Sequence, residues 1–136
     1  MKLKRLCTRL LLAVAVLASG LAASQVVRAQ AAAGAKAGTS PETIKGYVID
    51  SACTFTKHLK KPISPDCAIA CAKAGSDLVI QTEAGTIYWP ISADTPATGQ
   101  NDKLMSYAGK MVSVTGKVYT KGGSKAIVID KVEAAD

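Results

Sequence analysis

The chain has 136 residues and a formal net charge of +7, with 17 Lys and Arg against 10 Asp and Glu. Five of the basic residues and none of the acidic ones lie in residues 1–28, which leaves 12 Lys against 10 acidic residues, a formal charge of +2, for the rest. No arginine follows Arg28, so bidentate recognition of phosphate or guanine is excluded, and we expect no nucleic-acid partner.

The N-terminus has the features of a secretory signal peptide. Basic residues precede an apolar run at residues 10–17 that is too short to span a bilayer, and small residues follow before Ala29. We therefore expect residues 1–29 to be removed on export. The mature protein should be periplasmic or secreted, with no membrane attachment after cleavage.

Residues 30–40 (QAAAGAKAGTS) contain no large apolar side chain, so they are predicted to form a disordered Ala/Gly linker. The folded domain is expected at residues 41–133. A domain of this size has a small core and benefits from a disulfide bond or a bound metal.

Five strands are predicted from runs of β-branched and aromatic residues, at residues 43–50, 77–82, 86–91, 111–119 and 126–132. The run MVSVTGKVY alternates most clearly, with Val112, Val114 and Val118 on one face. Gly46, inside the first strand, is typical of a bulge or a sharp bend.

Two helical segments are predicted between the strands. Residues 64–75 have Ser64 as N-cap, Pro65 at the first helical position and Gly75 at the end. A second short segment is expected at residues 101–108. Five strands with a helix between the third and fourth follow the order of the OB-fold, a Greek-key barrel. We therefore predict a mainly β, five-stranded OB-fold-like barrel with a cysteine-bearing helical insert between strands one and two.

Three short patterns support this prediction: G-x-V-x-D-x-x-C at residues 46–53, C-A-x-x-C-A-x-x-G at 67–75, and Y-A-G-K-x-V-x-V-x-G at 107–116. Together they resemble small exported bacterial OB-fold-like proteins of unassigned function. The resemblance covers about residues 46–132. It implies a fold and a compartment, and it brings no established activity with it.

The insert holds the chemistry-bearing residues, with Cys53, His58, Cys67 and Cys71 spaced as C-x4-H-x8-C-x3-C. Three thiols and one imidazole are the ligands of a tetrahedral Cys3His zinc site, and soft thiolates also suit Cu(I). His58 is flanked by lysines that disfavour a bound cation, which makes it the weakest of the four candidate ligands. The favoured hypothesis is a zinc or copper site, with His58 as an optional fourth ligand.

A disulfide bond is the alternative use of these cysteines, because exported cysteines are commonly oxidised. Residues four apart on a helix have Cβ atoms about 5–6 Å apart, whereas a disulfide needs about 3.5–4.5 Å, so Cys67 and Cys71 should not bond to each other. Cys53 would then pair with Cys67 or Cys71. Cys71 is preferred if Cys67, near the helix N-terminus, is the reactive thiol.

The barrel offers a second possible binding surface, formed by Tyr47, Tyr88, Trp89 and Tyr119, which could stack on a saccharide or contact a protein partner. The sequence shows no nucleophile elbow, P-loop, HExxH motif or paired carboxylates, and no third residue that would orient a Cys–His pair. We therefore expect a monomeric binding or accessory module rather than an enzyme.

Overall fold

The computed structural model describes residues 36–38 and 40–135, and the predicted signal peptide at residues 1–29 lies outside the described residues, as does most of the predicted linker. Within the part that is described, no helix is both long enough and apolar enough to cross a membrane.

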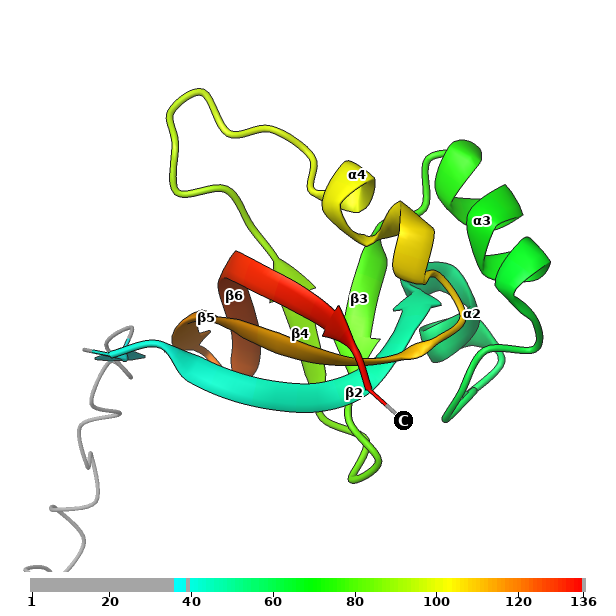
Figure 1. Ribbon diagram of the computed structural model, residues 1–136, viewed down its shortest axis with the longest axis horizontal. Coiled ribbons are helices and arrows are strands. Elements are labelled where there is room, and N and C mark those ends of the chain that lie inside the picture. The colour runs from blue at the N-terminus through cyan, green and yellow to red at the C-terminus, as the bar shows by residue number, and fades with distance from the viewer. Residues whose placement is uncertain (1–35, 39, 136) are drawn as a thin grey trace, which may run out of the picture. The chain divides into compact units, whose positions relative to one another are not determined.

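The described residues form six strands and four short helical segments (Figure 1). The strands are β1 (Lys36–Ala37), β2 (Glu42–Asp50), β3 (Leu78–Gln81), β4 (Ile87–Pro90), β5 (Met111–Lys121) and β6 (Ser124–Ala134). The helices are α2 (Ser51–Thr56), α3 (Pro65–Lys73) and α4 (Asn101–Leu104), and the 3-10 helix η1 (Met105–Tyr107) follows α4 directly. The five predicted strands correspond to β2–β6, and both predicted helical segments are confirmed. Neither β1 nor α2 was predicted.

The sheet closes into the predicted barrel. Its strands run β5-β2-β3-β4-β6, and a further antiparallel pairing between β5 and β6 closes the circle. Only β4 and β6 pair in parallel, so the barrel is mixed, as the OB-fold order requires. The strand β1 lies in the stretch assigned to the linker and pairs with Tyr119 and Thr120 of β5, beyond the part of β5 that pairs with β2. This backbone pairing does not depend on large side chains, which is why residue composition gave no sign of it.

Gly46 lies where β2 passes from one neighbour to the next. Tyr47, the next residue, pairs with Met111 of β5 on one side and with Gln81 of β3 on the other. A Cβ atom on Gly46 would lie 2.6 Å from the carbonyl oxygen of Gln81, so only glycine permits this approach of the two backbones.

The barrel interior is filled by alternating side chains and is capped at one end by α3. The fully buried interior residues include Val48, Ile80, Val112, Val114 and Ile127. Ala68 and Ala72 of α3 belong to the same buried cluster, so this helix packs on the barrel through its smallest side chains. Figure 1 shows α2 and α3 together at the end of the barrel where β2 ends. The cysteine-bearing insert is thereby held against a rigid core.

Candidate metal centre

Cys53 is positioned by the start of α2. The carboxylate of Asp50, the N-cap residue, accepts a hydrogen bond of 2.8 Å from the backbone N–H of Cys53. The hydroxyl of Thr54 donates to the carbonyl oxygen of Asp50 at 2.9 Å. Asp50 is 2% exposed and Cys53 is 6% exposed. The D-x-x-C part of the first sequence pattern is therefore a helix cap that fixes a buried thiol.

Cys67 and Cys71 are positioned by α3. The hydroxyl of Ser64 accepts a hydrogen bond of 3.1 Å from the backbone N–H of Cys67, which confirms the predicted N-cap. Because Ala68 and Ala72 face the core, the two cysteines that precede them lie side by side at the edge of the buried face, where both are half-buried. The repeated C-A-x-x spacing thus gives α3 one row of alanines for packing and one row of thiols.

The three thiols meet between α2 and α3. The Sγ atoms of Cys53, Cys67 and Cys71 all lie within 4.8 Å of one another, and the three thiols are free. Zinc–sulfur bonds of about 2.3 Å place the sulfurs of a tetrahedral site about 3.8 Å apart, whereas a disulfide bond is about 2.05 Å long. The three sulfurs are therefore close enough to bind one metal ion. Cys71 is near disulfide distance of both other thiols, but the Cys53–Cys71 bond of the alternative hypothesis is not formed.

His58 does not join this group. It is exposed, in the loop that connects α2 to α3, and its φ of 52° places it in the left-handed region. Among the described residues, no histidine or carboxylate completes a four-ligand cluster with the three cysteines.

Burial and the neighbouring carboxylate control the protonation of the thiols. The pKa of Cys53 is raised from 9.0 to about 11, chiefly by burial. The Asp50 carboxylate raises this pKa further, because it accepts a hydrogen bond from the thiol and repels the thiolate. The positive charge of Lys57 acts in the opposite direction. The pKa of Cys71 is raised as well, first by burial and then by the negative charge of Asp50. Without metal, both groups are neutral thiols at pH 7, and a metal that binds them must displace their protons.

We expect the reduced, metal-free protein to lose stability as the pH rises from about 9 to about 11. In this window the folded state keeps the Cys53 proton that the unfolded state releases, because the pKa is raised from 9.0 to about 11 on folding. The contribution is complete below pH 9 and disappears above the folded pKa. Melting temperatures of the wild type and Cys53→Ala, measured across this range, test it. The wild type should fall more steeply than the variant, and two parallel curves would contradict the assignment.

The third sequence pattern, at residues 107–116, contains the turn that holds the start of α3 in place. Gly109, in the turn after η1, has a φ of 81°, and a Cβ atom on it would lie 2.5 Å from the Cα atom of Pro65 at the start of α3. The backbone N–H of Gly109 donates to the carbonyl oxygen of Val48 at 2.8 Å, and that of Val48 donates to Lys110 at 3.0 Å. This turn therefore joins the N-terminus of α3 to β2. Sequence reasoning missed that Asp50 caps the helix that carries Cys53 and that Gly109 contacts Pro65, although both residues stand in the patterns that it singled out.

The four aromatic candidates for a ligand face lie in different places. Tyr88 is part of the buried core, whereas Trp89 stacks on Phe55 of α2 with ring centroids 6.1 Å apart. The ammonium group of Lys117 lies 5.4 Å from the ring centroid of Tyr119. Tyr47 alone of the four lines a cleft on the barrel surface.

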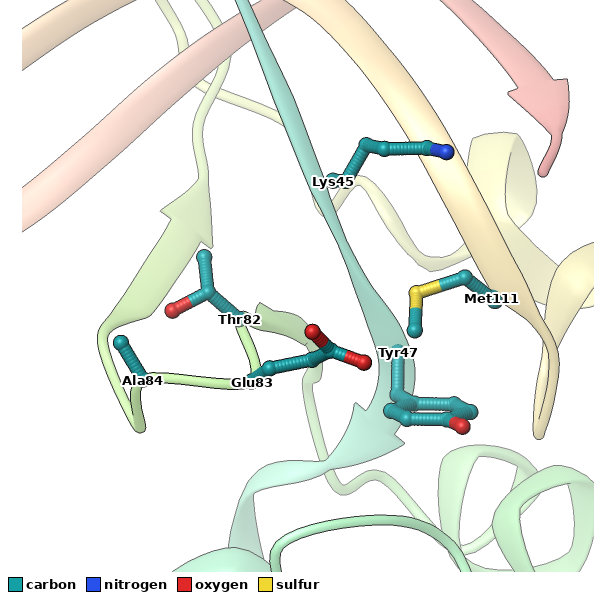
Figure 2. Close-up of a pocket in the computed structure, with 6 residues that line it drawn as sticks. All are labelled: Lys45, Tyr47, Thr82, Glu83, Ala84 and Met111. Atoms are coloured by element: carbon teal, nitrogen blue, oxygen red, sulfur yellow. The ribbon is translucent and has the colours of Figure 1, made fainter. Parts of the chain in front are cut away.

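This cleft lies between the β3–β4 turn and the strands β2 and β5, and its volume is about 520 Å³ (Figure 2). Its lining residues are Lys45, Tyr47, Thr82, Glu83, Ala84 and Met111. In Figure 2, the side chains of Tyr47 and Met111 lie next to each other, and the Glu83 carboxylate points toward them. The cleft contains none of the three cysteines, so it is separate from the thiol group.

Comparisons with known proteins identified no relative. No family model, no curated protein and no solved structure matches the chain. The functional assignment therefore rests on the geometry of the site.

Proposed function

We propose that this protein is an exported, non-catalytic accessory module that binds a zinc or copper ion through Cys53, Cys67 and Cys71. The observation that carries the proposal is the convergence of three thiols, from two separate helices, within 4.8 Å. The N-caps of α2 and α3 and the contact between Gly109 and Pro65 position these thiols. A set of cysteines that served only to fill the core would not need their sulfurs to meet.

The raised pKa values of Cys53 and Cys71 favour metal binding over nucleophilic catalysis by these two residues. A catalytic cysteine needs a lowered pKa and an adjacent base, whereas burial and Asp50 raise the pKa values of Cys53 and Cys71. A metal ion overcomes the same obstacle by replacing the protons directly. His58 would become a fourth ligand only if the α2–α3 loop brought it to the sulfurs.

A second candidate function is a domain stapled by a Cys53–Cys71 disulfide that binds a saccharide or a partner protein on the barrel face. The observation that favours it is the cleft beside Tyr47, where an aromatic ring, a thioether and a carboxylate face one space. We propose for either function that the protein acts as a monomer in the periplasm or outside the cell.

The two functions are separated by metal analysis combined with a thiol count. The mature protein, purified from its export compartment under argon, is analysed for zinc and copper and is alkylated before and after reduction. Metal binding predicts about one equivalent of metal, three alkylated thiols after the metal is removed, and loss of the metal in Cys67→Ser.

A metal-free protein with one alkylated thiol and a Cys53–Cys71 bridge would contradict the metal proposal. Reloading the reduced protein with zinc or Cu(I) in vitro then serves as a second check. Failure to bind either ion after full reduction would reject the metal site completely.

A further inference from the structure

The described site offers sulfur ligands only, and three of them. His58, which is the single histidine of the sequence, and the described aspartates and glutamates, including the neighbouring Asp50, stay outside the group. Asp50 uses a carboxylate oxygen to cap α2, so its movement toward a metal would release the helix that holds Cys53.

Three sulfurs without a fourth ligand suit Cu(I) better than zinc. Zinc in structural sites is almost always four-coordinate, and three-ligand zinc sites normally hold a water molecule for catalysis. Cu(I) is soft, prefers thiolates, and is fully coordinated by two or three of them. The excess negative charge of three thiolates is partly offset by Lys57, which ends α2 and interacts with Cys53.

The thiols differ in their access to solvent. Cys53 is buried, whereas Cys67 and Cys71 are half-buried at the edge of α3. An ion held by all three would therefore be bound on its buried side by Cys53. An incoming ligand would reach it from the partly exposed side, where Cys67 and Cys71 lie. A ligand exchange from that side needs no opening of the barrel.

We propose that the three cysteines form a three-coordinate Cu(I) site that passes its ion to a thiol-bearing acceptor by associative exchange on the α3 side. This inference rests on the proposed metal-binding function. An acceptor thiol loses its proton to solvent and forms a new Cu–S bond on the α3 side, and the Cu–S bond to Cys67 or Cys71 breaks as that thiolate takes up a proton. A second acceptor thiol replaces the other α3 thiolate in the same way. The last Cu–S bond, to Cys53, then breaks, the Cys53 thiolate takes up a proton, and the ion leaves bound to the acceptor. Copper stays Cu(I) throughout, and no electron is transferred.

The selectivity is tested by competition titrations, with bicinchoninate for Cu(I) and a fluorescent chelator for zinc. Wild type is compared with His58→Asn, because asparagine tolerates the left-handed backbone at this position. We expect Cu(I) to bind about 1,000-fold or more tightly than zinc. We also expect His58→Asn to change neither affinity by more than about twofold, since the imidazole is not a ligand. Zinc affinity equal to that of Cu(I), or a tenfold loss in His58→Asn, would overturn the proposal in favour of a closed Cys3His zinc site.

The exchange is tested by mixing the Cu(I)-loaded protein with dithiothreitol as the acceptor in a stopped-flow experiment. Associative exchange predicts a rate that rises in proportion to the dithiothreitol concentration, and a rate independent of that concentration would overturn it. Failure of the proposed function looks different, because neither ion would then bind at all.

Discussion

Replacing Cys71 by serine is expected to lower the affinity for a soft metal ion by about 100-fold or more. Structural zinc sites bind with roughly 10–16 kcal/mol, so each thiolate accounts for several kcal/mol, and each 1.4 kcal/mol is a factor of ten. Cys71 is the thiol that lies near disulfide distance of both others, so its loss leaves Cys53 and Cys67 as the two remaining sulfur ligands. Chelator competition with Cu(I) and with zinc measures the change.

Ala70→Ser is the matched control for this variant. It places the same serine on an exposed position of the same helix and removes no sulfur. The free energy of unfolding of both variants should lie within about 1 kcal/mol of the wild-type value, since neither position is fully buried. Equal metal affinities for Cys71→Ser and Ala70→Ser would show that Cys71 is not a metal ligand.

Gly109→Ala is expected to destabilise the protein and to weaken metal binding at the same time. The new Cβ atom would lie 2.5 Å from the Cα atom of Pro65, so the start of α3, which carries Cys67, must move. We expect a loss of about 3–4 kcal/mol in the free energy of unfolding, from backbone strain and overpacking together. Thermal melting and Cu(I) competition on the same preparation measure both effects.

Gly85→Ala isolates the backbone strain. Gly85 has a φ of 85°, close to the 81° of Gly109, but a Cβ atom there meets nothing within 4 Å. It should lose only about 1–2 kcal/mol and keep its full metal affinity. The melting temperature of Gly109→Ala should lie roughly 10 °C below that of Gly85→Ala. If the two variants behave alike, the contact between Gly109 and Pro65 does not position α3.

The barrel and the helix α3 could be predicted because local patterns determine them. Val112, Val114 and Val118 alternate in the sequence, and all three are buried on one face of β5. Ser64 and Pro65 marked the start of α3 by the chemistry of a helix N-terminus. These signals need no knowledge of distant residues.

The short helix α2 was missed because its six residues show no helical period and include two β-branched threonines. Its stability comes from the Asp50 cap and from its place on the barrel. An aspartate followed by Ser-Ala-Cys is itself an N-cap signal, so the helix could have been found from the sequence.

The sequence indicated which three cysteines form the site, but their arrangement depends on the tertiary structure. Cys67 and Cys71 share a helix face by spacing alone, whereas Cys53 reaches them only because β2 ends beside α3. The lysines beside His58 already marked it as the weakest of the four candidate ligands, and the structure leaves it exposed in the α2–α3 loop. The contact between Gly109 and Pro65 could not be predicted, because it joins residues far apart in the sequence that no local pattern relates.

The most direct test of the central claim, that three cysteines form one metal centre, is X-ray absorption at the metal edge of protein loaded with one equivalent of Cu(I). We predict a first shell of three sulfur atoms at about 2.2–2.3 Å, which loses sulfur in Cys71→Ser. A first shell of nitrogen and oxygen, unchanged by that substitution, would contradict it.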